Sequence, residues 1–192
     1  MTIPANHTII LASQSPRRKE LLAGLGIQFT VMPKDTPEDF PAALQGAEIA
    51  TFLSRRKSEA FTPDELPDNF LLITADTIVW IDGKVLNKPA DSSEAFTMLR
   101  TLSGNKHTVF TGVTLRSASK AITFSAATDV WFRHLTNEEI EHYLHHYKPY
   151  DKAGSYGVQE WIGYVGISRI EGSYYNVMGL PTQQLYLELS RF

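Results

Sequence analysis

Short apolar runs alternate along the chain with longer segments in which apolar residues recur at helical spacing. We predict strands at the short runs and helices at the periodic segments. The predicted strands are 8–11, 28–32, 70–75, 78–81, 84–86, 108–116 and 121–133. The predicted helices start at 16, span 42–60 and 92–102, run from the capping box at 136–139 to about 147, and start again near 182. The segment 154–179 is predicted to hold loops and strands.

This alternation, together with the Asp82-Gly83 hairpin signal, predicts an α/β fold with a mixed, curved sheet flanked by helices. No linker, repeat or low-complexity tract divides the chain. We therefore expect one domain over 1–192. The length of 192 residues and 43% hydrophobic content allow one sizeable core or at most two small lobes.

Composition excludes several classes of protein. The net charge of -3 argues against bulk nucleic-acid binding, and the lack of cysteine excludes disulfides and thiolate catalysis. No apolar stretch approaches the 18 residues or so of a membrane span, and the segment Met1–His7 is polar. We expect a soluble cytoplasmic protein with no membrane partner.

The first predicted helix begins with three cations, Arg17, Arg18 and Lys19, where the helix dipole is already positive. Ser15 is a good N-cap, and a proline follows it at the first helical position. A bound anion would relieve the charge conflict. The free N–H groups, the Ser13 and Ser15 hydroxyls and the two guanidinium groups would suit a phosphate. The alternative is a solvated basic helix end.

Asp76 follows the buried strand 70–75, at the carboxyl end where α/β sheets place ligand groups. A buried carboxylate needs an ionic, hydrogen-bonding or metal partner, and a divalent cation that bridges phosphates is one such partner. The alternative is an aspartate that caps the adjacent turn. Lys88 follows the hairpin and could place an ammonium beside the same site, or it could be an ordinary surface lysine.

Two late segments also carry candidate chemistry. Asp151 and Lys152 precede two glycines, which suggests a loop whose backbone approaches something closely, although a plain turn remains possible. The small residues and tyrosines of 172–181 could shape a base pocket or an aromatic edge of the core.

Together these segments resemble one family, the Maf-like nucleoside triphosphate pyrophosphatases. The resemblance rests on 11–18, 75–77, 82–83, 88–89, 151–154 and 179–181, in that order. It implies hydrolysis between the α- and β-phosphates to a nucleoside monophosphate and pyrophosphate. It also implies a divalent metal, Mg²⁺ or Mn²⁺, a homodimer, and a single elongated domain of the Maf/ITPase-like type with its active site in a cleft.

The resemblance also assigns residues. Asp76 matches the proton acceptor, which activates water or holds the metal, and Glu38 matches an acidic position that serves the metal. The positions around the phosphates are matched by Ser13, Arg17, Arg18, Lys57 and Lys88. Asp151 and Lys152 match the late active-site motif.

Substrate choice is also implied by the resemblance. Arg17, Thr77 and Gln159 match the group that prefers thymidine and uridine triphosphates, whereas the 7-methyl-GTP group carries an aromatic residue, a glutamine and a glutamate there. An amide can donate to and accept from the pattern shared by uracil and thymine, so we expect use of both dTTP and UTP. The chain departs from the family pattern at Pro37, Asn87 and Glu160-Trp161.

Other functions are less consistent with these residues. A non-catalytic nucleotide-binding regulator of cell division would not need Asp76, Glu38 and Asp151 together, so their presence favours an enzyme. A 7-methyl-GTP pyrophosphatase is the alternative within the family. An RNA-binding protein is disfavoured by the overall acidity. The expected role is house-cleaning of the nucleotide pool, including modified pyrimidine nucleotides.

Overall fold

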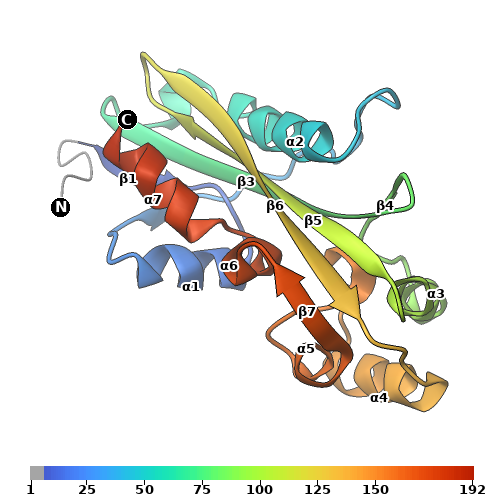
Figure 1. Cartoon of the computed structure of the whole chain (residues 1–192). Helices are drawn as coiled ribbons and strands as arrows, with labels where there is room; N and C mark the ends of the chain where they lie inside the picture. Colours follow the sequence, from blue (N-terminus) through green and yellow to red (C-terminus); the bar gives the residue numbers. More distant parts are fainter. Residues whose placement is uncertain (1–6) are drawn as a thin grey trace. The chain divides into compact units, whose positions relative to one another are not determined.

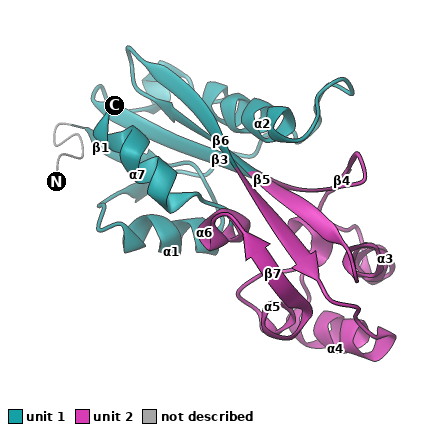
Figure 2. Ribbon diagram, viewed as in Figure 1, with its two compact units in different colours: residues 1–76, 111–126, 179–192 teal, residues 77–110, 127–178 magenta. Residues whose placement is uncertain are grey.

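The computed structural model describes residues 7–192, so the predicted polar segment before His7 lies outside the described residues. The chain divides into two compact units (Figure 2). Unit 1 comprises residues 1–76, 111–126 and 179–192, and unit 2 comprises residues 77–110 and 127–178. Three strands contribute residues to both units. The division into units therefore does not test the prediction of a single domain.

Unit 1 is a layered α/β structure. Strand β1 (Thr8–Leu11) pairs in parallel with β2 (Thr30–Val31) and with β3 (Phe70–Ile81), and the strand order continues through β5 (Lys106–Arg116) and β6 (Ala121–Phe132). Figure 1 shows α2 (Ala47–Glu59) on one side of these strands. On the other side lie α1 (Pro16–Gly24) and α7 (Thr182–Ser190). A short 3₁₀ turn, η1 (Pro63–Glu65), follows α2.

Local sequence signals explain how these elements form and pack. The Ser15 side chain accepts a hydrogen bond from the Arg18 N–H at 3.4 Å, as predicted for an N-cap, and Leu21 and Leu22 of α1 are buried. Helix α2 approaches the sheet at Gly112, where an added Cβ would lie 2.2 Å from the backbone oxygen of Ala50. Glycine therefore sets the closeness of this helix–sheet contact.

Unit 2 is built around the other ends of the shared strands. The Asp82-Gly83 turn has positive φ at both positions (49° and 75°), as a type I′ hairpin requires, and joins β3 to β4 (Lys84–Leu86). Strand β7 (Ile167–Glu171) pairs antiparallel with β6. The helical segments are α3 (Ser92–Leu102), α4 (Asn137–Tyr147), η2 (Ala153–Ser155), α5 (Trp161–Gly166) and α6 (Tyr174–Met178).

Three predictions of the elements were wrong in detail. The predicted strands 70–75 and 78–81 form one strand, β3. Helix α2 begins at Ala47 rather than at 42, because Gly46 adopts φ 48° and ψ −119°, a conformation that glycine tolerates and that interrupts a helix. Three short helical segments (η2, α5 and α6) occupy much of 154–179, and they are too short to show helical periodicity in the sequence.

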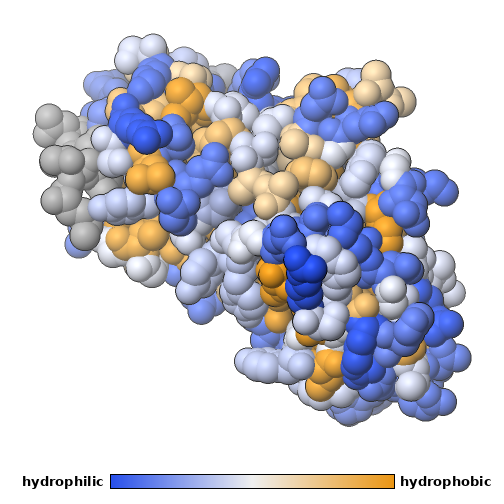
Figure 3. Space-filling view, in the orientation of Figure 1, coloured by the Kyte–Doolittle hydropathy of each residue, from blue (hydrophilic) through white to orange (hydrophobic). Residues whose placement is uncertain are grey.

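The predicted mixed sheet flanked by helices is confirmed, with parallel pairs at β1 and antiparallel pairs at β4 and β7. Within residues 7–192, no helix is both long and apolar enough to cross a bilayer. The face of the molecule seen in Figure 3 is mainly hydrophilic, and its hydrophobic residues lie in small separate patches.

Candidate active site

A lysine that bridges two carboxylates lies at the centre of the predicted site residues of unit 1. Lys57 Nζ donates a hydrogen bond to Glu38 Oε1 at 3.0 Å and a second one to Asp76 Oδ1. The Asp76 side chain is 9% exposed, the Lys57 side chain 16% and the Glu38 side chain 46%. The pair of Lys57 and Asp76 is therefore largely withdrawn from water, whereas Glu38 lies at its rim.

The periodicities of β3 and α2 explain why Lys57 and Asp76 meet. Residues two apart in a strand share a face, so Thr74 and Asp76 point the same way. The Thr74 hydroxyl donates to the backbone oxygen of Ser54 at 2.7 Å, which shows that this face of β3 packs against α2. Ser54 and Lys57 are three residues apart in α2 and so lie on the same side of that helix.

Asp76 differs from its sequence-based prediction in one respect. It lies inside β3, not at the end of a strand, and it does not cap a turn. Its carboxylate is nevertheless buried and paired, as the cost of an isolated buried charge requires. The sequence predicted the need for a partner correctly, and the structure identifies that partner as an ammonium.

The start of α1 brings more of the predicted residues to this region. Ser13 is buried, and its hydroxyl accepts a hydrogen bond from the Ser15 N–H at 3.2 Å. The Arg18 side chain donates from Nε to the backbone oxygen of Gly179 at 2.9 Å. Burial lowers the pKa of Arg18, and the carboxylates of Asp76 and Glu38 act in the opposite direction. Arg18 therefore lies within the electrostatic reach of both acidic residues.

Unit 2 holds a second lysine between two carboxylates. Lys152 Nζ lies 2.7 Å from Asp151 Oδ1 and 3.1 Å from Glu160 Oε1. The Lys152 side chain is 9% exposed and that of Glu160 19%, whereas Asp151 is 60% exposed. Tyr143 donates its hydroxyl proton to Glu160 Oε2 and accepts a hydrogen bond from the Gly157 N–H at 3.0 Å.

Sequence reasoning missed Glu160 and Tyr143 as members of this cluster, and noted Glu160 only as a departure from the family pattern. Tyr143 follows Ile140 by three residues and directly precedes Leu144, and all three belong to the buried face of α4. That spacing could have predicted its burial, and a buried phenol needs a hydrogen-bond partner.

Three other predicted residues lie in unit 2. Thr77 is partly buried in β3, and Lys88 is exposed in the loop after β4. The loop before Lys88 contacts the late motif, since the Gly154 N–H donates to the Asn87 oxygen at 3.2 Å. Gly154 has φ 68°, and an added Cβ would lie 3.0 Å from a methyl group of Val79, which confirms the predicted close approach of this backbone. Gln159 Oε1 is buried with no hydrogen-bond partner among the described residues.

Lys57, Glu38 and Asp76 form what we call the Lys57 cluster, and its two carboxylates are of the type that binds a hard divalent cation. Among residues 7–192 no group of three His, Cys, Asp or Glu side chains could hold a metal. Two carboxylates, Glu38 and Asp76, nonetheless converge on one cationic group. Mg²⁺ is typically bound by one or two carboxylates with phosphate oxygens and waters, so such a pair suits a metal that arrives with a phosphate substrate.

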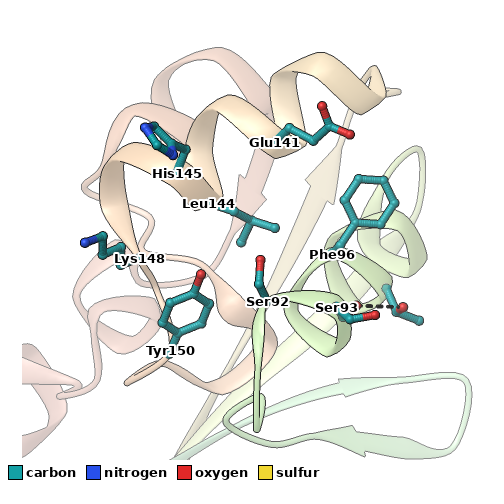
Figure 4. A pocket seen from close by; sticks show the side chains of 9 residues that line it. Ser92, Ser93, Phe96, Glu141, Leu144, His145, Lys148 and Tyr150 are labelled. Carbon is teal, nitrogen blue, oxygen red and sulfur yellow. Dashed lines mark hydrogen bonds between the residues drawn. The ribbon is translucent and has the colours of Figure 1, made fainter.

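A separate groove of about 910 Å³ lies between α3 and α4 in unit 2 (Figure 4). Leu144 and Phe96 form part of its floor, with Lys148 and His145 from the end of α4 beside them. None of the predicted site residues lines this groove. It is therefore not the site that the sequence predicts.

Nearly the whole chain is similar to known proteins. Residues 8–192 match the family model described as Maf-like protein. A protein of Bacteroides thetaiotaomicron named dTTP/UTP pyrophosphatase is 55% identical over 186 residues, which cover 96% of each chain. Proteins of the same name are 54% identical in Porphyromonas gingivalis (97% of this chain, 94% of that one) and 48% identical in Flavobacterium psychrophilum (96% and 94%).

Among solved structures, the Staphylococcus aureus Ham1 protein matches with a TM-score of 0.43 and 15% identity, over 65% of this chain and 71% of that chain. This distant likeness does not bear on the site. The family match over residues 8–192 and the matches to the relatives, by contrast, span nearly the full length of the chain. The chain belongs to the Maf-like protein family.

Proposed function

We propose that the protein hydrolyses dTTP and UTP at the bond between the α- and β-phosphates, to give the monophosphate and pyrophosphate. Relatives about half identical over almost the whole chain carry the name dTTP/UTP pyrophosphatase. Within the structure, the observation that carries the proposal is the buried Asp76 carboxylate paired with Lys57. The cationic start of α1 lies within electrostatic reach of that carboxylate.

In this proposal the chain of phosphates is held by cations and by the start of α1. Arg17 and Arg18 supply guanidinium groups that match phosphate oxygens, and the helix N-terminus adds its dipole. The anion also relieves the unfavourable position of these cations, since no acidic residue lies in the first turn of α1. Lys57, already in contact with Asp76, adds an ammonium near the same place.

The chemical step is an attack of water on the α-phosphorus. The water oxygen forms a bond to phosphorus, the bond from that phosphorus to the bridging oxygen breaks, and pyrophosphate leaves. Asp76 accepts the proton of the attacking water. Lys57 binds Oδ1 of Asp76, so Oδ2 is the proposed proton-accepting atom. No covalent intermediate is needed.

A divalent metal, Mg²⁺ or Mn²⁺, would be held by Glu38 and Asp76 together with phosphate oxygens. When bound, it would neutralise phosphate charge and lower the pKa of a bound water. The pairing of both carboxylates with a single ammonium supports this assignment, because that ammonium shows that their shared space suits a cation.

Base choice is assigned to Arg17, Thr77 and Gln159. The buried Oε1 of Gln159, which has no hydrogen-bond partner among the described residues, supports this choice. A buried acceptor without a donor is unfavourable, and the N3–H of uracil or thymine could supply the missing donor. The protein is further proposed to form a homodimer. It is proposed to act in the cytoplasm, where nucleoside triphosphates and their modified pyrimidine forms are found.

A panel of nucleoside triphosphates with Mg²⁺ or Mn²⁺ tests the proposal, with pyrophosphate and orthophosphate assayed separately. We expect monophosphate and pyrophosphate, with dTTP and UTP as the preferred substrates. Release of orthophosphate with a nucleoside diphosphate would contradict the assigned bond. Preference for 7-methyl-GTP would move the protein to the other group of the family, and binding without turnover would favour a regulator.

A further inference from the structure

We infer that Glu160, held in place by Tyr143, is a positioning residue that fixes the ammonium of Lys152 for the triphosphate. This inference rests on the proposed function, and it takes Lys152, which matches the late active-site motif of the family, as a residue that binds the triphosphate. It adds two residues that neither the family resemblance nor the comparisons assign. The contacts that carry it all lie within unit 2.

The two carboxylates that flank Lys152 are not equivalent. Asp151 is 60% exposed and adjacent to Lys152 in the chain, so water competes for its carboxylate. Glu160 is 19% exposed, with Oε1 on Lys152 and Oε2 on the Tyr143 hydroxyl. Moving Glu160 away would break both contacts at once. Glu160 is therefore the anchor of the ammonium, and Asp151 is its more exposed neighbour.

Tyr143 links this anchor to a rigid element. Its ring is fully buried on α4, between the helix and the late motif. Burial raises the pKa of the Tyr143 hydroxyl well above its usual range, and the hydrogen bond to Glu160 acts in the same direction. The phenol thus stays protonated and donates to Glu160 at every pH at which the protein would work. Tyr143 and Glu160 therefore connect Lys152 to helix α4.

The backbone of Glu160 also closes the turn that carries Gln159. The Glu160 N–H donates to the Gly157 oxygen at 3.0 Å, which closes the turn 157–160. An added Cβ at Gly157 would lie 2.7 Å from the Glu160 carboxyl carbon, so a larger residue there would require this carboxylate to shift. The Glu160 side chain therefore contacts Lys152, while the Glu160 backbone closes the turn that carries Gln159.

Electrostatic repulsion and positioning predict opposite changes in substrate binding when the charge of Glu160 is removed. A carboxylate near a polyphosphate repels it, so by electrostatics alone Glu160→Gln should improve substrate binding. If Glu160 positions Lys152, the same substitution should weaken binding. The glutamine oxygen can still accept from Tyr143, so the turn itself should remain intact.

The test compares Glu160→Gln and Tyr143→Phe with two matched controls from the same unit. Glu171→Gln removes an exposed ion pair with Arg169, and Tyr147→Phe removes the hydroxyl of the ring stacked on Tyr143. We expect KM for UTP and dTTP to rise about tenfold in Glu160→Gln and about threefold in Tyr143→Phe, as expected for loss of a hydrogen bond to a charged group. We expect kcat to change by less than about threefold, because the reacting atoms are untouched. The controls should match the parent.

A double-mutant cycle with Lys152→Met identifies the route of the effect. If Glu160 acts through Lys152, Glu160→Gln should change KM little once Lys152 is absent. Calorimetric binding of pyrophosphate should weaken by the same factor, without any turnover. Melting temperatures of all the variants show whether a loss comes from unfolding. If Glu160→Gln fails to fold, Tyr143→Phe carries the same test.

Several outcomes would overturn the inference: a lower KM in Glu160→Gln, an unchanged KM, or an effect of equal size in the Lys152→Met background. These results require a parent protein that releases pyrophosphate from UTP or dTTP. A parent that does not release it would instead contradict the proposed function. In that case, pyrophosphate binding would still report on the anchor.

Discussion

Each unit of the molecule contains a largely buried lysine between a less exposed and a more exposed carboxylate. The two clusters differ in what holds the less exposed carboxylate. In unit 1, Lys57 pairs with buried Asp76 and with exposed Glu38. In unit 2, Lys152 pairs with Glu160, and Tyr143 binds the other oxygen of that carboxylate. Similar ion pairs can therefore serve different purposes.

The second oxygen of the less exposed carboxylate decides the difference. Asp76 meets the ammonium through Oδ1, and the proposed reaction uses Oδ2 to take a proton from water. Both oxygens of Glu160 are engaged by protein groups, so this carboxylate is suited to hold a neighbour in place. Neither oxygen of Glu160 is therefore left to take a proton from water. The comparison assigns chemistry to the Lys57 cluster and positioning to the Lys152 cluster.

The largest expected effect comes from Asp76→Asn. The substitution keeps the shape of the side chain but removes the charge and the base, so we expect turnover to fall by at least about 10²-fold with the fold intact. Steady-state kinetics would measure turnover, and circular dichroism would show whether the fold is intact. The control is Asp39→Asn, which removes an exposed partner of Arg56. Near-normal turnover in a folded Asp76→Asn variant would mean that another residue is the proton acceptor.

Removing each lysine in turn tests whether the two clusters differ in their ability to bind a divalent metal. Lys57→Met leaves the buried Asp76 without its cation, and such a loss typically costs about 3–5 kcal/mol of stability. We expect Mg²⁺ or Mn²⁺ to restore part of this stability, because the metal can replace the ammonium between Glu38 and Asp76. Lys152→Met should gain no comparable stability from the metal.

Thermal melts with and without metal would measure both lysine variants. Equal stabilisation of the two, or none in Lys57→Met, would remove the distinction between a metal-binding cluster and a positioning cluster.

The smallest expected effect concerns the start of α1. Arg17→Glu should abolish the stabilisation that pyrophosphate gives the parent, which is about 2.7 kcal/mol at about 100 times the dissociation constant. Without ligand, the variant should be as stable as the parent or slightly more stable, because a glutamate complements the helix dipole. Thermal-shift series at rising salt would show the parent's shift weaken. A destabilised variant would instead make Arg17 structural.

The fold was predictable where one local signal decides the outcome. Helix α3 runs from Ser92 to Leu102 as predicted, and the Asp82-Gly83 turn forms the expected hairpin. The start of α2 was not predictable from periodicity, because the apolar spacing continues before Gly46 while the backbone does not. Periodicity describes side chains, whereas a single residue with positive φ changes the path of the chain.

The site was predictable as a set of residues but not as a set of contacts. The sequence and the family resemblance named Lys57 and Asp76, whereas only the packing of α2 on β3 shows that they pair. Glu160 and Tyr143 were missed because their contact joins positions 17 residues apart, one in the turn before α5 and the other in α4. A lysine's buried counter-charge is set by tertiary packing, which no local pattern encodes.

Hydrolysis in water labelled with oxygen-18 tests the central claim most directly, because it locates the phosphorus that water attacks. The proposed reaction, with Asp76 aiming water at the α-phosphorus, predicts one heavy oxygen in the UMP formed from UTP and none in the pyrophosphate. Mass spectrometry of the two products would give the result. Heavy oxygen in the pyrophosphate, or labelled orthophosphate with UDP, would contradict the account.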